Sequence, residues 1–160
     1  MTPDAMTIYL ACTIRGNRGA LDAARALADR LQRQGHTVLT THLLGDDADA
    51  AEGALTEQQV YERDIRLLET ADMLIAEASG SSYGVGFEVG YVLGRAAATG
   101  QRVLVVFDEA RRPVVSRLIT GVSHPACTVR GYHDAADLLA VVEDYLSSCT
   151  PTPEARPAGS

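Results

Sequence analysis

The chain has 160 residues, which is enough for one domain with a full hydrophobic core, and 46% of them are hydrophobic. No apolar run approaches the length needed to span a membrane, so we expect a soluble protein with no membrane partner. The net charge of −7 disfavours nucleic acid as a partner, because non-specific binding to nucleic acid needs a basic surface. A small anionic ligand is the better match.

Three cysteines, Cys12, Cys127 and Cys149, form an odd set without the spacing of a metal site. This pattern predicts reduced thiols and no bound metal. The N-terminal residues carry neither a basic segment nor the apolar core of a signal peptide, so we expect a cytoplasmic protein.

The elements follow one another in a regular order along the chain. A buried strand is expected at residues 6–13, a helix at 17–34, a strand at 36–42 and an acidic, alanine-rich loop at 45–54. The remaining expected elements alternate in the same way: helix 57–70 with Thr56 as its cap, strand 71–77, helix 83–99, strand 102–108, helix 114–120, strand 127–130 and helix 135–147. This alternation predicts an α/β domain with a five-stranded parallel sheet and helices on both faces. The domain should span residues 1–148, and the proline-rich residues 149–160 should form a disordered tail.

Ligands of open α/β sheets bind beyond the carboxyl ends of the strands. Residues 13–18, 42–46 and 78–88 follow the first three strands and hold most of the chemically interesting side chains. Their convergence at one edge of the sheet is the main argument for an active site.

The run 81–90 (SSYGVGFEVG) joins a strand to a helix. Hydroxyls and glycines at such a turn form an anion cradle, because free backbone N–H groups and the helix dipole favour negative charge. Glu88 lies one helical turn inside this cradle, where it would repel a phosphate that was merely bound. The run therefore indicates chemistry on a phosphorylated substrate.

Other side chains allow two interpretations each. Glu88 and Asp64 form a carboxylate pair suited to glycosidic cleavage, or surface acids, with Asp64 paired to a neighbouring arginine such as Arg63. Tyr9 is a core tyrosine or reaches the site from the face it shares with Thr13. Arg15 binds a phosphate, which a guanidinium group suits because it bonds bidentately, or is a solvated surface residue. His42 is equally consistent with a ligand contact and a surface histidine.

One helix carries Gly86, Gly90 and Gly94 at four-residue intervals. Each glycine costs the helix about 1 kcal/mol relative to alanine, so we expect close packing against the sheet or a partner helix to offset the cost.

Three segments in the same order resemble the 2′-deoxynucleoside 5′-monophosphate N-glycosidases, within the nucleoside deoxyribosyltransferase superfamily. The segments are 9–16 (YLACTIRG), 62–64 (ERD) and 82–90 (SYGVGFEVG), and the resemblance extends over residues 6–147. It implies a Rossmann-like three-layer fold, a homodimer with shared active sites, and no cofactor or metal. The chain departs from the family at Cys12, where glycine is usual, and at Thr13, where serine is common.

The resemblance also assigns roles to individual residues. Glu88 matches the glutamate that attacks the anomeric carbon, Asp64 the acid that assists departure of the base, and Tyr9 the tyrosine that orients the glutamate. Ser116 matches a serine that reaches the phosphate in the neighbouring subunit's site. The other implied substrate-binding residues lie at the phosphate, the sugar or near the base: Thr13, Ile14, Arg15, Gly16, His42, Ser82 and Gly84.

The expected function is hydrolysis of the N-glycosidic bond of a 2′-deoxynucleoside 5′-monophosphate through a covalent glycosyl-glutamate intermediate. The products would be the free base and 2-deoxyribose 5-phosphate. A nucleoside 2-deoxyribosyltransferase is the nearest alternative, although it needs no phosphate cradle. A ribonucleotide N-glycosidase and a non-catalytic nucleotide-binding module are further alternatives, and the latter leaves Glu88 and Asp64 without a role.

Overall fold

The computed structural model of the chain describes residues 4–13, 18–41, 44–45 and 48–149. Within these residues, five parallel strands form one sheet in the order β2-β1-β3-β4-β5. The strands are β1 (Thr7–Cys12), β2 (Thr37–Val38), β3 (Met73–Glu77), β4 (Arg102–Asp108) and β5 (Cys127–Tyr132). The expected α/β fold with a five-stranded parallel sheet is confirmed, and no helix of the described part is long and apolar enough to cross a membrane.

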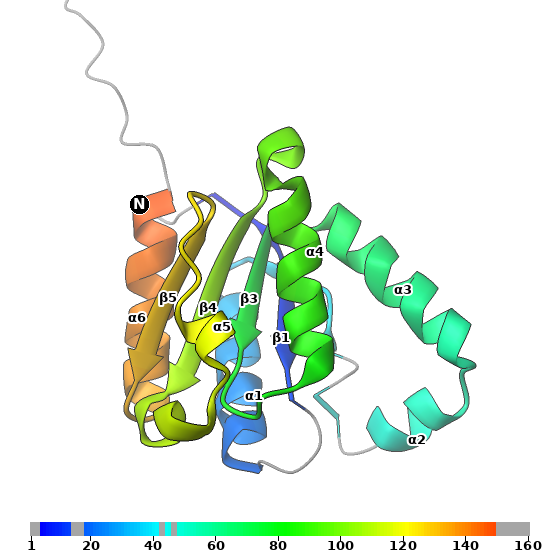
Figure 1. Ribbon diagram of the computed structural model, residues 1–160, viewed down its shortest axis with the longest axis horizontal. Helices are drawn as coiled ribbons and strands as arrows, with labels where there is room; N and C mark the ends of the chain where they lie inside the picture. Colours follow the sequence, from blue (N-terminus) through cyan, green and yellow to red (C-terminus); the bar gives the residue numbers. More distant parts are fainter. Residues whose placement is uncertain (1–3, 14–17, 42–43, 46–47, 150–160) are drawn as a thin grey trace, which may run out of the picture.

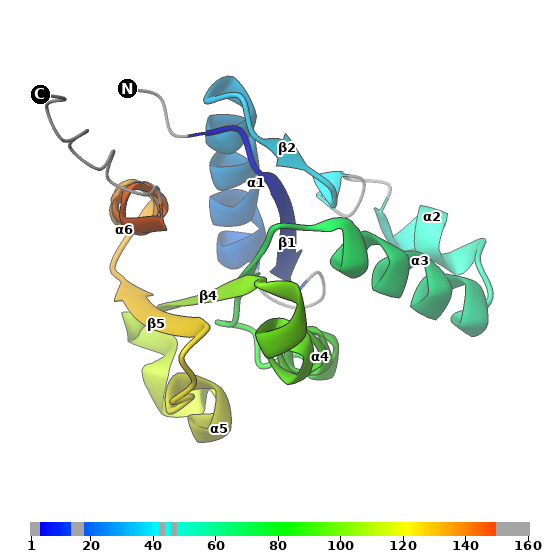
Figure 2. The ribbon, with the colours of Figure 1, turned by 90° about the horizontal axis from the view of Figure 1, so that it is seen from above.

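Helices cover both faces of the sheet (Figures 1 and 2). On one face lie α1 (Arg18–Arg33) and α6 (Ala135–Cys149), which bury apolar residues such as Leu27 and Leu138 against the strands. On the other face lie α4 (Tyr83–Thr99) and the short α5 (Arg117–Thr120). Successive strand residues point to opposite faces, so the longer strands β1, β3 and β4 supply both apolar clusters.

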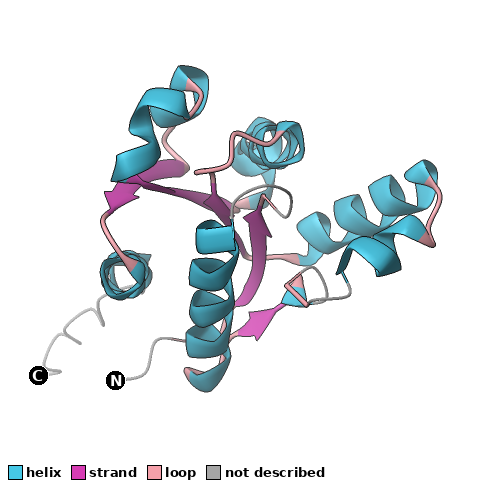
Figure 3. Ribbon diagram, turned by 90° about the horizontal axis from the view of Figure 1, so that it is seen from below, coloured by secondary structure: helices cyan, strands magenta, loops and turns pink. Residues whose placement is uncertain are grey.

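A pair of helices, α2 (Ala48–Gly53) and α3 (Glu57–Thr70), projects as an arm beside the β1–β2 edge (Figures 2 and 3). Thr56 caps α3 as expected, because its hydroxyl accepts from the Gln59 backbone while the Gln59 side chain accepts from the Thr56 backbone. Leu68 is the buried residue of α3. The prediction of a loop over residues 45–54 is wrong, because α2 occupies 48–53 of this alanine-rich segment.

Other boundaries also differ from the sequence-based expectation. β2 is a two-residue strand rather than a seven-residue one, because Thr40 replaces the backbone ladder: its side chain donates to the carbonyl oxygen of Leu10 and accepts from the Leu10 N–H. The helix expected at 114–120 is shorter, because α5 covers only Arg117–Thr120, and a 3₁₀ helix, η2 (Glu109–Val114), precedes it. Helix α6 extends to Cys149, so the predicted tail, which began at 149, can start only after that residue, and residues 150–160 lie outside the described part.

The strand order places the topological switch between β1 and β3. From β1 the chain moves outward to β2 and then returns to the other side of β1 to form β3. Crevices at such a switch, beyond the carboxyl ends of the strands, are where open α/β sheets bind ligands. The β3–α4 turn and the end of β1 meet there.

Candidate active site

The centre of the site is a contact between β1 and α4. The buried Tyr9 hydroxyl donates a hydrogen bond to Oε1 of Glu88 at 2.5 Å. Tyr9 packs in the apolar cluster on the α4 face of the sheet. The contact brings together two residues that the sequence analysis named as catalytic.

The carboxyl group of Glu88 has an altered acidity. Its pKa is raised from 4.5 to about 7, chiefly by burial and also by the carboxylates of Asp64 and Glu52, against the opposite effects of the Tyr9 hydrogen bond and of Arg63. Burial and the adjoining carboxylate also raise the pKa of the Tyr9 hydroxyl, so Tyr9 stays a donor. Glu88 is therefore a carboxyl group that gains or loses its proton near neutral pH.

Asp64 reaches the same neighbourhood from α3. Its Oδ1 accepts a hydrogen bond from Arg63 Nε at 2.7 Å, so the expected alternative of an arginine pair is present. Arg63 also donates through Nη2 to Glu52 Oε1 on α2, at 2.7 Å. Asp64 nevertheless acts electrostatically on both Tyr9 and Glu88, so this pair belongs to the site rather than to a remote surface.

The β3–α4 turn lies directly over the end of β1. Ser81 adopts a left-handed backbone conformation with φ of 52°, and its hydroxyl donates to the Val114 carbonyl oxygen at 2.8 Å. Gly80 approaches Thr13 so closely that a Cβ atom on residue 80 would overlap the Thr13 side chain. Among the described residues, buried Thr13 Oγ1 has no hydrogen-bond partner, which leaves a free hydroxyl at the carboxyl end of β1.

Ser82 and Ser116 line one cavity of about 380 Å³ between the start of α4 and α5. Each serine is the N-cap of its helix, and neither side chain makes a capping hydrogen bond. Two serine hydroxyls without a capping role therefore line the same cavity of one chain, and Gly84 lies on the first turn of α4 beside Ser82.

The glycine stripe of α4 faces open space. A Cβ atom at Gly86, Gly90 or Gly94 would meet no atom within 4 Å in the described part of the chain. The sheet therefore does not supply the close contact that the sequence analysis considered. Near the stripe, Tyr83 is 99% exposed and Leu118 82% exposed.

Four residues named from the sequence lie outside the described part of the chain: Ile14, Arg15, Gly16 and His42. Cys12, which replaces a family glycine, packs against the apolar cluster on the α1 face, opposite to Tyr9. Burial raises the pKa of its thiol to about 12, so Cys12 is not a thiolate nucleophile. Among the described residues, no cluster of three His, Cys, Asp or Glu side chains could hold a metal ion.

Sequence reasoning missed a buried polar network beneath the β3–α4 turn. Oε1 of Glu77 accepts hydrogen bonds from Tyr132 Oη at 2.9 Å and from the Ser79 hydroxyl, which itself accepts from the Asp108 N–H at 2.8 Å. This network attaches the turn to β4 and β5. Sequence reasoning also missed Glu52, for which the signal in the sequence was its place in an acidic segment.

Comparisons with known proteins agree with the geometry. The profile of the nucleoside 2-deoxyribosyltransferase family matches residues 8–137. A Thermofilum pendens protein, named provisionally as a 2′-deoxynucleoside 5′-phosphate N-hydrolase, is 38% identical over 88% of this chain and 95% of its own. The 5-hydroxymethyl-dUMP N-hydrolase of Danio rerio is 32% identical over 91% of this chain and 99% of its own.

A solved structure shares the fold at lower sequence identity. The CMP N-glycosidase BcmB of Clostridium botulinum superimposes with a TM-score of 0.62 and 19% identity, covering 87% of this chain and 98% of the other. The expected Rossmann-like architecture is thereby confirmed.

Proposed function

Because the chain belongs to the nucleoside 2-deoxyribosyltransferase family, we propose that it hydrolyses the N-glycosidic bond of 2′-deoxynucleoside 5′-monophosphates. The products are the free base and 2-deoxyribose 5-phosphate. The observation that carries the proposal is the 2.5 Å contact between Tyr9 and Glu88 at the switch point of the sheet. Ser82 and Ser116 line a cavity beside the N-terminal end of the helix that carries Glu88.

Glu88 is the nucleophile in this proposal. Tyr9 donates to Oε1, which orients the carboxylate and leaves Oε2 to attack the anomeric carbon. The C–N bond breaks, its electron pair leaves with the base, and Asp64 assists this departure. Water then attacks the glycosyl ester, which releases the sugar phosphate and restores the carboxylate.

The 5′-phosphate occupies the cavity of Ser82 and Ser116. Support comes from the free serine hydroxyls, the N-terminal N–H groups of the 17-residue helix α4, and Gly84 on its first turn. By resemblance, Arg15 contacts the phosphate, Ile14 packs near the 2′ position of the sugar, His42 lies near the base, and Thr13 and Gly16 contact the substrate. The unpaired hydroxyl of Thr13 supports its part in this assignment.

The active enzyme is a homodimer. The open glycine stripe on α4 lets a second helix approach closely, and the exposed Tyr83 and Leu118 would become buried in such a contact. Ser116 can then act on the phosphate of its own chain or on that of the partner. The compartment is a separate part of the proposal: the reaction takes place in the cytoplasm, where the three free cysteines stay reduced.

The test is incubation of the purified protein with a panel of nucleosides and nucleotides, with chromatography of the released base. Release from deoxynucleoside monophosphates, and not from deoxynucleosides, is expected. A transferase would instead need a second base as acceptor and accept nucleosides. A ribonucleotide glycosidase would prefer ribonucleoside monophosphates, and a binding module would release no base.

A further inference from the structure

Arg63 is shared between two carboxylates from different helices. Its Nε donates to Asp64 on the same helix, and its Nη2 donates to Glu52 on α2, both at 2.7 Å. The three side chains are only 20–29% exposed, whereas the surface pair of Arg95 and Glu69 is 39% and 45% exposed. Solvent therefore screens the Glu52–Arg63–Asp64 triad less than an ordinary surface pair.

This triad acts on the group that we propose as nucleophile. The groups that act electrostatically on Glu88 are Tyr9 from β1, Asp64 and Arg63 from α3, and Glu52 from α2. Arg63 is the cation in this set of described residues. The three carboxylates are those of Asp64, Glu52 and Glu88 itself. Three like charges that are partly buried repel one another unless a cation offsets them.

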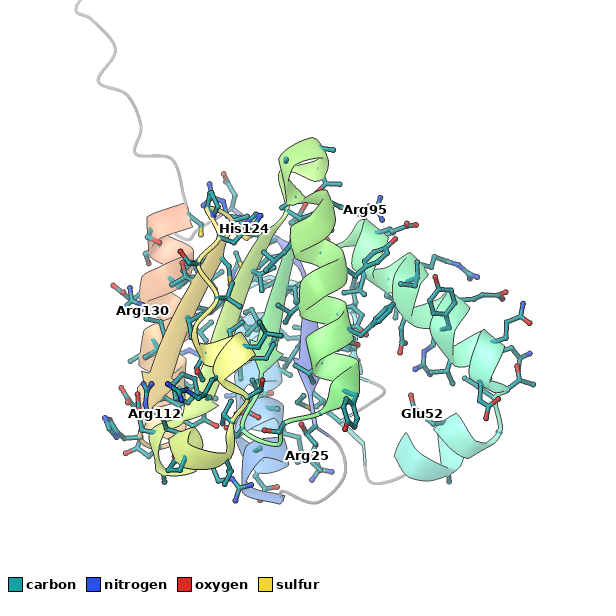
Figure 4. The ribbon with its side chains drawn as sticks, viewed as in Figure 1. Arg25, Glu52, Arg95, Arg112, His124 and Arg130 are labelled. Atoms are coloured by element: carbon teal, nitrogen blue, oxygen red, sulfur yellow. The ribbon has the colours of Figure 1, made fainter. Side chains whose placement is uncertain are left out.

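We propose that Arg63 and Glu52 are positioning residues of the reaction centre. Arg63 holds Asp64 and offsets its charge beside Glu88, and Glu52 adds a negative charge to the same group of side chains through its bond to Arg63. Glu52 thereby connects the projecting arm to the chemistry, and Figure 4 shows it on α2, across from the N-terminal end of α4. The inference rests on the proposed role of Glu88 as nucleophile.

A purely structural ion pair and a pair that controls charge around Glu88 predict different directions for the change in the pKa of Glu88. If the Arg63–Glu52 pair only braced α2 against α3, removing either partner would break the same contact and have the same effect. If the pair controls charge around Glu88, the two removals act in opposite directions. Loss of the Arg63 cation makes Glu88 harder to ionise, and loss of the Glu52 anion makes it easier.

The ionisation of Glu88 can be followed directly by ¹³C NMR of protein labelled at the glutamate side-chain carboxyl carbon. The Glu88→Gln variant identifies the Glu88 signal, because that signal disappears. Arg63→Gln should move the titration midpoint of Glu88 upward and Glu52→Gln should move it downward, each by roughly half a unit to one unit for a nearby, partly screened charge.

The matched control is Glu69→Gln. It removes the same charge from α3 and breaks a comparable pair, with Arg95 on α4, and Glu69 is not among the groups that act on Glu88. Figure 4 places Arg95 well away from Glu52, toward the C-terminal half of α4. The titration curve of Glu88 in the Glu69→Gln variant should coincide with that in the wild type.

A second readout uses turnover. If Glu88 must be ionised to attack, the acid limb of kcat/KM should shift in the same directions as the NMR midpoint. Equal shifts of one sign in both variants, or no shift in either, would overturn the proposal. If Arg63→Gln does not fold, a midpoint in Glu52→Gln that stays unchanged or moves upward is enough to reject it. The NMR titration needs no substrate, so absence of base release in the wild type would reject the proposed function without deciding this inference.

Discussion

Tyr9 and Glu88 are 79 positions apart in the sequence, yet the Tyr9 hydroxyl donates to Glu88 Oε1 at 2.5 Å. The ring of Tyr9 is held by the apolar cluster beneath α4, so its hydroxyl is presented from a rigid base. A donor fixed in this way stabilises the carboxylate against the burial that raises its pKa.

Tyr9→Phe should therefore lower kcat/KM by about tenfold to a hundredfold, as expected for loss of a hydrogen bond to a charged group. Because the Tyr9 bond lowers the pKa of Glu88, the acid limb of the pH profile should also move upward. The measurement is base release as a function of pH. Tyr91→Phe removes an exposed hydroxyl that bonds Glu69 and should leave the profile unchanged; a similar change in both variants would contradict the prediction.

Glu88→Ala should abolish base release by several orders of magnitude, because the nucleophile is lost while no core packing is. Circular dichroism and gel filtration would show an intact fold. Retention of more than about a tenth of wild-type turnover would exclude Glu88 as the nucleophile.

Glu88→Gln should make the protein more stable than the wild type above pH 7. The pKa of Glu88 is about 7 in the folded protein against 4.5 as the ordinary value, so the folded state binds this proton more tightly. Its contribution to stability is complete below pH 4.5 and is lost as the pH rises through 7. Melting temperatures should thus differ on the alkaline side and converge on the acidic side; a constant difference at every pH would contradict this.

Gly80→Ala should destabilise the protein by about 1–3 kcal/mol, because the new methyl group overlaps the Thr13 side chain. The β3–α4 turn would have to shift, so KM for the monophosphate should rise as well. Denaturant titration measures the first effect and steady-state kinetics the second. Gly53→Ala is the control, since a Cβ atom there meets nothing within 4 Å.

Gly90→Leu should produce folded monomers. A side chain at residue 90 has open space within its own chain and improves helix propensity, but it would block a second helix on the stripe. Light scattering would report half the mass of the wild-type dimer. A Gly90→Leu dimer would show that the interface lies elsewhere.

Ser116→Ala should weaken binding of monophosphates without changing the mass in solution. If Ser116 serves the partner's site, mixing this variant with Glu88→Ala should restore some activity, because one site of each mixed dimer has both wild-type residues. If Ser116 serves the cavity that it shares with Ser82 in its own chain, no activity returns even when subunit exchange is demonstrated.

The sequence by itself determined the layered α/β fold and the position of the β3–α4 turn. These features depend on local periodicity, helix caps such as Thr56, and glycine at the β3–α4 turn, all of which act within a few residues. The sequence motifs also identified Glu88, Asp64 and Tyr9, which the structure brings into one electrostatic environment.

Only the tertiary structure decided how these residues interact. The partner of the Tyr9 hydroxyl, the bridge from Asp64 through Arg63 to Glu52, and the cavity shared by Ser82 and Ser116 all join distant elements. The acidity of Glu88 follows mainly from burial, which periodicity cannot measure for a helix that is apolar on several sides. The short β2 is a second example of an outcome that local patterns cannot predict. The β-rich segment pairs with β1 only at its start, and the Thr40 side chain then bonds the Leu10 backbone in place of further strand pairing. Long-range contacts of this kind are properties of the folded chain, so no local pattern encodes them.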